Sequence, residues 1–433
     1  MQDAQLRETE AVFKLIRQSA TDGKVDLAGF ERMLRDALLK DGACMFERFL
    51  NNEIPSLVKP PALRSGERFH SRQDMTVCTL FGPIKLRRDY YRGPRGGRFP
   101  LDETLALHRH YTPAVTQLMC WASAMDSSFE LASETLLRFA SLNIPGRQVQ
   151  RVVNDLGSQA SAWMRTRPPQ QRSTPVEVLN IQADMTGIPM RPEELKGIKG
   201  KQPDGSAKTR QIKTGCVFTQ SLDANGEPQR DPFSTTYLTK FCDVTDFGTL
   251  LRSEAMKRGY ANARKTVFIG DGAEWIWNIA NDCFKDAVQI VDFYHAGEHL
   301  HALCQLLESD ESKSKALFAD WRKRLLNNGL SKLLLETEKR ADSLDQNRRK
   351  QINTEINYLK KNAPRMTYKT FRSKGYFIGS GAVEGACRHI VAQRAKLSGM
   401  RWLYSGADNV LAFRSIIKSG LFDNYCASRK VAA

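Results

Sequence analysis

Two aspartates in the sequence directly follow apolar runs that are typical of buried strands. Asp184 ends the run VLNIQAD, and Asp271 follows KTVFIG between Gly270 and Gly272. A carboxylate at the C-terminal end of a strand is held rigidly while it faces the crevice where α/β sheets bind ligands. Small neighbours let a ligand approach the backbone closely. We interpret Asp184 and Asp271 as half of a metal site; for each one alone, a turn aspartate that caps the next helix is the alternative.

A third acidic residue, Glu384, lies in GSGAVEGACRHIVAQRAK, where glycines precede a predicted helix. That helix places Glu384 and Arg388 on one face, so an exposed salt bridge is the alternative interpretation. Mg²⁺ prefers oxygen ligands and retains waters, so Asp184, Asp271 and Glu384 with a phosphate can hold two ions, Mg²⁺ or Mn²⁺. One ion activates a water or a 3′-hydroxyl and the other stabilises the leaving oxygen. The predicted chemistry is cleavage and joining of phosphodiester bonds without a side-chain nucleophile.

The composition indicates a polyanionic partner. Lys and Arg number 65 and Asp and Glu 48, which gives a formal net charge of +17 over 433 residues. Nucleic acid is the first candidate, and a solvated basic surface is the alternative. The nine cysteines are scattered without a CxxC pair, and no apolar run is long enough to cross a membrane. We therefore expect a reduced, cytoplasmic protein that binds DNA and no membrane.

The predicted elements follow the order of an α/β protein with an RNase H-like sheet. Three strands come first, and two further strands then alternate with helices up to Asp292. Apolar spacing in the preceding region predicts mainly helices, with a β-hairpin at MTVCTLFGPIKLRRDYY. The predicted parts are an N-terminal helical region at 1–70, the hairpin and a basic loop at 71–110, a helix-turn-helix-like region at 111–164, a linker at 165–175, the first part of an RNase H-like catalytic domain at 176–298, an all-α insertion at 299–370, and the last part of the catalytic domain with the Glu384 helix at 371–425.

Residues 129–157 have the outline of a helix-turn-helix. The exposed side of its second helix carries Arg147, Gln148 and Arg151, residue types that contact phosphates and base edges in a major groove. An ordinary helical hairpin is an equally good interpretation, because the pattern is common in helical domains.

Four segments of the chain, ADMTGIPM, FIGDGAEWIWNIA, IVDFYHAGEHL and GSGAVEGACRHIVAQRAKLSGMRW, together resemble the Kra-type bacterial insertion-sequence transposases. These belong to the DDE class and are related to the Mutator-like transposases. The resemblance extends from about residue 76 to 417. It implies that Asp184, Asp271 and Glu384 are the three catalytic carboxylates on an RNase H-like fold. The 384 − 271 = 113 residues between the last two leave room for an α-helical insertion.

Asp292 and His295 match the [C/D]xxH signature that such transposases carry after the second aspartate. The resemblance therefore implies that His295 contacts the phosphate or orders the site, with Asp292 in support. His295, His299 and His301 lie close together in sequence, and a zinc pair at i, i+4 is the alternative. A supporting histidine is favoured, since Cys304 is the only soft ligand nearby and a structural zinc site normally has four ligands.

Basic and aromatic residues next to these segments are further candidates for DNA contacts. Lys396 and Arg401 follow Glu384 and are interpreted as phosphate contacts. Trp275 and Trp277 follow Asp271; stacking on an unpaired base and core packing are both open, and core packing is favoured.

The loop RGPRGGRFP after the hairpin departs from the family pattern. The resemblance leads us to expect a CPxCG knuckle here, but Gly93 and Gly96 stand at the cysteine positions, which argues against a zinc ribbon. Arg95, with Arg92 and Arg98, is instead predicted to bind phosphates, because glycines expose backbone N–H groups and arginines bind oxyanions in a forked geometry.

The resemblance implies an enzyme that binds the terminal inverted repeats of its own element, cleaves there and transfers the 3′ ends to target DNA. Such enzymes act as homodimers or larger assemblies on paired ends, at the nucleoid in the bacterial cytoplasm. A non-catalytic DNA-binding protein derived from a transposase is one alternative, and an RNase H-like nuclease that only hydrolyses is another. The three intact carboxylates favour catalysis over a non-catalytic DNA-binding protein. Strand transfer distinguishes a transposase from a nuclease that only hydrolyses.

Overall fold

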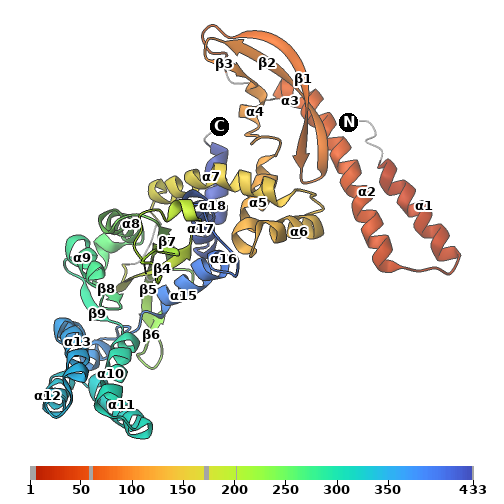
Figure 1. Cartoon of the computed structure of the whole chain (residues 1–433). Helices are drawn as coiled ribbons and strands as arrows, with labels where there is room; N and C mark the ends of the chain where they lie inside the picture. Colours follow the sequence, from red (N-terminus) through yellow and green to blue (C-terminus); the bar gives the residue numbers. More distant parts are fainter. Residues whose placement is uncertain (1–5, 58–61, 170–174, 201, 432–433) are drawn as a thin grey trace. The chain divides into compact units, whose positions relative to one another are not determined.

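The computed structural model describes residues 6–57, 62–169, 175–200 and 202–431 and divides into two compact units (Figure 1). One unit comprises residues 1–156 and 423–433, and the other residues 157–422. Residues 170–174 of the predicted linker lie outside the described residues. Both units contain helices and strands, so the chain is a mixed α/β protein. Within the described ranges, no helix has both the length and the apolar character needed to cross a bilayer.

The first unit begins with a pair of helices, α1 (Arg7–Thr21) and α2 (Leu27–Arg48), which pack against each other. Asp41 of α2 is buried, and its carboxylate accepts hydrogen bonds from the Thr9 backbone N–H at 2.9 Å and from the Thr9 hydroxyl at 2.7 Å. The Thr9 N–H lies in the first turn of α1, where backbone N–H groups have no acceptor within their own helix, and Asp41 supplies the missing acceptor.

A three-stranded antiparallel sheet follows, built from β1 (Arg68–Thr79), β2 (Gly82–Gly93) and β3 (Gly96–Arg98). β1 and β2 form the predicted hairpin. Buried residues alternate with more exposed ones in the halves of both strands next to the turn, so one face of this part of the hairpin is covered. The buried cluster joins this face to the chain after α2 and contains Leu50, Ile54, Met75, Val77, Ile84 and Leu86.

The helices after the hairpin are α4 (Pro100–Thr104), α5 (Pro113–Met125), α6 (Phe129–Ala140) and α7 (Gly146–Thr166). The Ser128 hydroxyl accepts a hydrogen bond from the Leu131 N–H and caps α6, which ends at Ser141 in the left-handed conformation. α7 runs on to Thr166, beyond the end expected near residue 157. Buried residues continue at helical spacing through this extra length.

The second unit contains a six-stranded mixed sheet. Its strands are β4 (Val178–Pro189), β5 (Thr209–Leu222), β6 (Pro228–Arg230), β7 (Thr236–Lys240), β8 (Lys265–Gly270) and β9 (Val288–Val291). They are ordered β6-β5-β4-β8-β9, and β7 also pairs with β5. β4 is antiparallel to β5 and parallel to β8, which is parallel to β9.

Helices α8 (Val244–Lys257) and α9 (Glu274–Cys283) connect the parallel strands. β8 is buried from Thr266 to its end, as expected for a central strand covered on both faces. Residues from β4, β8, α8 and α9 form one apolar core, in which Phe247, Phe268 and Ile276 are fully buried.

A group of helices, α10 (Phe293–Leu307), α11 (Glu311–Leu326), α12 (Leu330–Ala341) and α13 (Gln346–Asn362), lies between β9 and the segment with Glu384. Aspartates cap three of them: Asp292 at α10, Asp310 at α11 and Asp345 at α13. α14 (Tyr368–Ser373) follows in the chain and contacts α11.

The last helical part begins with α15 (Gly381–Ala386), continues as a π-helical segment (Cys387–Ala392) and ends with α16 (Gln393–Ala395). π-Helical segments are rare and often occur at functional sites. α17 (Tyr404–Lys418) packs against β7, and α18 (Phe422–Val431) follows it in the chain.

Candidate functional site

The register of the central parallel strands sets the positions of Asp184 and Asp271. β4 and β8 pair in parallel as far as Gln182 and Ile269, and the two aspartates follow, each two residues further along its own chain. β4 does not end at Asp184, as the sequence suggested, but continues to Pro189, because its second half pairs with β5. Asp184 therefore lies just beyond the end of the parallel ladder and not at the end of its strand.

Asp184 is half-buried and has two close partners. Its carboxylate accepts a hydrogen bond from the Met185 N–H at 2.6 Å and another from the Cys387 thiol at 3.2 Å. Burial raises the pKa of Cys387, and the charge of Asp184 raises it further, so the thiol keeps its proton and remains a donor.

Asp271 follows β8 in a tight turn. Its side chain accepts a hydrogen bond from the Ala273 N–H at 2.8 Å, and its backbone carbonyl accepts one from the Tyr358 hydroxyl at 2.6 Å. The flanking glycines have an explanation within the protein, besides the ligand approach expected from the sequence. A Cβ at Gly270 would lie 2.6 Å from the Ile276 side chain, and a Cβ at Gly272, where φ is +98°, would lie 2.4 Å from the Tyr358 hydroxyl. Packing by the protein itself therefore requires both glycines.

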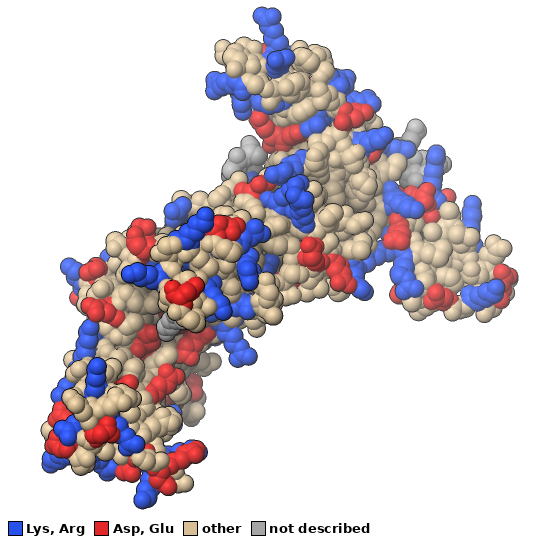
Figure 2. Space-filling view, viewed as in Figure 1, with Lys and Arg blue, Asp and Glu red and all other residues tan. Residues whose placement is uncertain are grey.

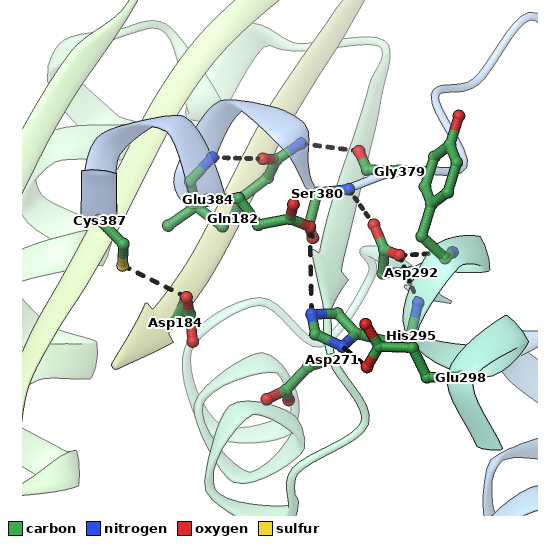
Figure 3. A network of polar contacts seen from close by, with 12 residues as sticks. Gln182, Asp184, Asp271, Asp292, His295, Glu298, Gly379, Ser380, Glu384 and Cys387 are labelled. Atoms are coloured by element: carbon green, nitrogen blue, oxygen red, sulfur yellow. Dashed lines mark hydrogen bonds and ion pairs between the residues drawn. The ribbon is translucent and has the colours of Figure 1, made fainter. Parts of the chain in front are cut away.

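Glu384 lies on α15, whose start is held by two buried side chains (Figure 3). Gln182 of β4 accepts a hydrogen bond from the Val383 N–H at 3.0 Å and donates one to the Gly379 carbonyl at 3.3 Å. Asp292 accepts a hydrogen bond from the Ser380 N–H. The start of α15 is thus tied to β4 and to the residue that follows β9, and this fixes the backbone that carries Glu384.

The Glu384 carboxylate accepts a hydrogen bond from the Ser380 hydroxyl at 2.6 Å and lies 4.0 Å from Nε2 of His295. In the part of the chain that the structure describes, no ion pair joins Glu384 to Arg388. The salt bridge considered as the alternative for this glutamate is therefore absent there.

His295 stands in the first turn of α10, and Asp292 caps that turn. The Asp292 carboxylate is fully buried and accepts hydrogen bonds from the Tyr294 N–H at 2.6 Å and the His295 N–H at 2.8 Å. The His295 ring contacts Glu298 through Nδ1 at 3.2 Å, which leaves Nε2 directed towards Glu384. Asp292 therefore connects the histidine and the glutamate segments.

The side chains of Asp184, Asp271, His295 and Glu384 converge on one region of the second unit (Figure 3). Among the described residues, no group of three His, Cys, Asp or Glu side chains is arranged so that it holds a metal ion as it stands. The three carboxylates thus lie in one region, but they do not form a closed metal cage in this conformation.

Mutual charge effects connect these residues. Burial raises the pKa of Asp184, and the charge of Asp271 raises it further, against the lowering effects of the Cys387 and Met185 hydrogen bonds and of His295. Burial lowers the pKa of His295, but the negative charges of Asp292, Glu298 and Asp271 outweigh this, so its pKa lies above the usual value. The region therefore favours positive charge on any group that enters it.

The predicted DNA contacts fall into two groups. Lys396 lies near the site, because its ammonium donates to the Thr186 hydroxyl on β4 and its charge acts on Cys387. Arg401 is exposed. In the first unit, Arg147 and Arg151 are exposed on α7, Gln148 is half-buried and Arg95 is exposed next to the β3 turn. Figure 2 shows Lys and Arg side chains spread over the visible face, with Asp and Glu among them.

Arg98, in contrast, is engaged inside the first unit. Its guanidinium pairs with Glu67 at 2.8 Å and with Glu103 at 2.7 Å. The hydrogen bond from Arg98, opposed by burial, holds the pKa of Glu67 at about 2. This arginine therefore stabilises the loop after the hairpin and does not extend to a phosphate, unlike what the sequence suggested.

The histidines and tryptophans near the site have structural partners. His299 stacks on Tyr358 and hydrogen-bonds Glu355 at 2.6 Å, and His301 packs edge-on against Phe318. Trp277 is only 4% exposed, as core packing requires. His299 and His301 thus each have a partner within the helical insertion.

Sequence reasoning missed three residues of this region: Gln182, Tyr358 and Cys387. Gln182 carried a signal, because it is a polar residue within the apolar run VLNIQAD, and a fully buried amide must find hydrogen-bond partners. Tyr358 and Cys387 lie in helical stretches where nothing in the local sequence distinguishes them.

A sequence model of an uncharacterised protein family, UPF0236, matches residues 25–201, which is less than half of the chain. The match includes Asp184 but neither Asp271 nor Glu384. No curated protein matches the sequence. Among solved structures, the chain is similar to a Drosophila P element transposase strand transfer complex, with 10% identity and a TM-score of 0.27, over 73% of this chain and 81% of that one. A score this low does not establish a common fold.

Proposed function

We propose that this protein is a DDE-class DNA transposase of a bacterial insertion sequence, built on an RNase H-like catalytic domain. The order of the strands supports this fold. β4 and β5 form an antiparallel pair, and both β6 and β7 pair with β5. On the other side of β4, β8 and β9 extend the sheet in parallel. The helices α10–α13 lie between the second and third carboxylates, where the insertion was expected.

The single observation that carries the proposal is the convergence of three acidic side chains from three distant segments. The β4–β8 register brings Asp184 and Asp271 to the same edge of the sheet, and α15 presents Glu384 to them. An accidental cluster of acidic residues at this position would be costly, because like charges in a half-buried region repel one another.

The donor set suits a divalent cation of the Mg²⁺ or Mn²⁺ kind. All three side chains offer oxygen, and the raised pKa of Asp184 reflects burial and a neighbouring negative charge that a cation would compensate. The Glu384 side chain is 46% exposed, so it can turn away from Ser380 towards the aspartates without disturbing the core. Two bound Mg²⁺ ions would supply activation of the attacking hydroxyl and stabilisation of the leaving oxygen.

The chain's own residues then bind and orient the DNA. His295, whose raised pKa favours the protonated ring, offers an Nε2–H donor to a phosphate oxygen next to Glu384. Lys396 contributes positive charge at the edge of β4. Arg147, Gln148 and Arg151 on α7 contact the terminal repeats, and Arg95 and Arg401 contact phosphates. The assembly on paired ends is a homodimer or larger.

The test is an incubation of the purified protein with Mg²⁺ and labelled duplexes that carry the terminal inverted repeats flanking its gene. We expect nicking and the transfer of a pre-cut 3′ end, and both should be lost in Asp184→Asn, Asp271→Asn and Glu384→Gln. End binding should persist in all three, since each substitution removes a ligand charge but keeps the shape.

Asp282→Asn is the matched control, because Asp282 is exposed on the neighbouring helix α9 and the chemical change is the same. It should leave cleavage unchanged. Cleavage without transfer of a pre-cut end would indicate a nuclease. Tight end binding without any cleavage by the wild type would instead support a non-catalytic DNA-binding protein.

A further inference from the structure

The helix α13 touches the segment of Asp271 along one of its faces. Tyr358 donates to the Asp271 carbonyl at 2.6 Å, Lys361 pairs with Glu274 at 3.0 Å, and Asn362 accepts a hydrogen bond from the Trp277 indole at 3.0 Å. Residues 358, 361 and 362 follow helical spacing, and their partners 271, 274 and 277 cover the turn after β8 and the first part of α9.

The contact with Asp271 is the best defined of the three. The Tyr358 ring is stacked on His299 of α10, with ring centroids 3.5 Å apart and an angle of 20° between the planes. Glu355 holds the His299 ring through a 2.6 Å contact with its Nδ1 atom. The hydroxyl therefore points in a direction fixed by three residues of the helical insertion.

The chemistry of Tyr358 suits a permanent donor. A phenol carries one O–H donor and keeps that proton at neutral pH, because the ordinary pKa of a tyrosine is about 10. The left-handed Gly272 lets this hydroxyl approach, because any Cβ there would collide with it. The contact between Tyr358 and the Asp271 carbonyl thus depends on the tyrosine hydroxyl and on the glycine that follows Asp271.

From these contacts we infer that Tyr358 is a positioning residue, through which the helical insertion holds the backbone of Asp271 in place for metal binding. This inference rests on the proposed function for its metal, but the positioning itself concerns the protein alone. Partners that orient metal ligands without touching the metal typically change affinity or activity by 10- to 100-fold.

The matched pair of variants is Tyr358→Phe and Tyr368→Phe. Both remove one buried phenol oxygen from the same unit, but the Tyr368 hydroxyl has no hydrogen-bond partner among the described residues. Tyr358→Phe keeps the ring stacked on His299, so the fold should survive; thermal unfolding of both variants checks this.

Two measurements test the inference. In metal-free protein, hydrogen–deuterium exchange of residues 271–276 should be faster in Tyr358→Phe than in the wild type and unchanged in Tyr368→Phe. In Mn²⁺ titrations followed by the electron paramagnetic resonance signal of free Mn²⁺, Tyr358→Phe should raise the Kd roughly ten-fold, Tyr368→Phe should not, and Asp271→Asn should abolish binding.

The outcomes separate the inference from the proposed function. Unchanged exchange in Tyr358→Phe, or an unchanged Mn²⁺ affinity while Asp271→Asn loses binding, would overturn the positioning role and leave the metal site standing. A wild type that binds no Mn²⁺ would remove the metal site and, with it, the role of Tyr358 in metal binding.

Discussion

The side-chain carbonyl of Gln182 accepts a hydrogen bond from the backbone N–H of Val383 at 3.0 Å. These residues are 201 positions apart in the chain, yet one lies two residues before Asp184 and the other immediately before Glu384. A single buried amide therefore links the strand of the first carboxylate to the helix of the third.

Replacement of Gln182 by Met should loosen this link, because Met fills the space but leaves the Val383 N–H without its acceptor. We expect the Mg²⁺ concentration for half-maximal cleavage to rise roughly ten-fold, with end binding retained. Gln220→Met is the control. Gln220 is also buried and donates to the carbonyl of Gly375, which precedes α15 by several residues in the chain. An equal change in the metal requirement of both variants would mean that general destabilisation is responsible.

Asp292→Asn tests the buried carboxylate that caps α10 and accepts from Ser380. The Asp292 carboxylate accepts hydrogen bonds from three backbone N–H groups. An asparagine has only one oxygen acceptor, and its NH2 group would face at least one of these N–H donors. The free energy of unfolding should fall by about 1–3 kcal/mol, the typical cost of an unsatisfied buried group. Urea denaturation measures this. Asp310→Asn, at the exposed cap of α11, should change it little, since Asn caps as well as Asp. Equal losses in both variants would contradict the linking role of Asp292.

The raised pKa of Asp184 predicts a dependence of stability on pH. A carboxyl whose pKa is higher in the folded than in the unfolded state stabilises the fold below its unfolded pKa, and this contribution is lost as pH rises through the folded pKa. At neutral pH, Asp184→Asn should therefore raise the Tm of the metal-free protein. The difference should shrink as pH falls through the raised pKa, because the wild-type carboxyl is then also neutral.

Mg²⁺ should reverse the order of the Tm values of the wild type and Asp184→Asn. Mg²⁺ should raise the Tm of the wild type at neutral pH and leave that of Asp184→Asn unchanged, because binding to the folded state alone stabilises it. If Asp184→Asn had a lower Tm than the wild type without metal, the hydrogen bonds of the Asp184 carboxylate would stabilise the fold more than its burial destabilises it.

Arg147 and Arg151 on α7 are the clearest test of the DNA-binding surface. Each alanine substitution should weaken binding to the terminal repeat and reduce the slope of log K against log salt by roughly 0.9, the release expected for one phosphate contact. Fluorescence anisotropy across a salt series measures both. Arg138→Ala is the matched control, because Arg138 already pairs with Glu134 at 2.7 Å on α6. An unchanged slope in the α7 variants would mean that this helix does not contact phosphates.

The sequence by itself determined the elements and the acidic candidates, because these depend on local patterns. Apolar runs that end at Asp184 and Asp271 identified strands β4 and β8, and the glycines before Glu384 identified the start of a helix. The predicted end of β4 was wrong, since Gly187 and Pro189 interrupt the apolar pattern after Asp184. The second half of the strand is held by pairing with β5, a partner that no local pattern reveals.

Only the tertiary structure decided how the candidates meet and what holds them. The contacts Gln182–Val383, Asp292–Ser380 and Tyr358–Asp271 join residues 201, 88 and 87 positions apart. Their energy depends on burial and on the direction of a single donor, which neither composition nor periodicity encodes. The same holds for Gly272, whose left-handed backbone was predictable as a turn but whose necessity comes from a tyrosine hydroxyl contributed by α13.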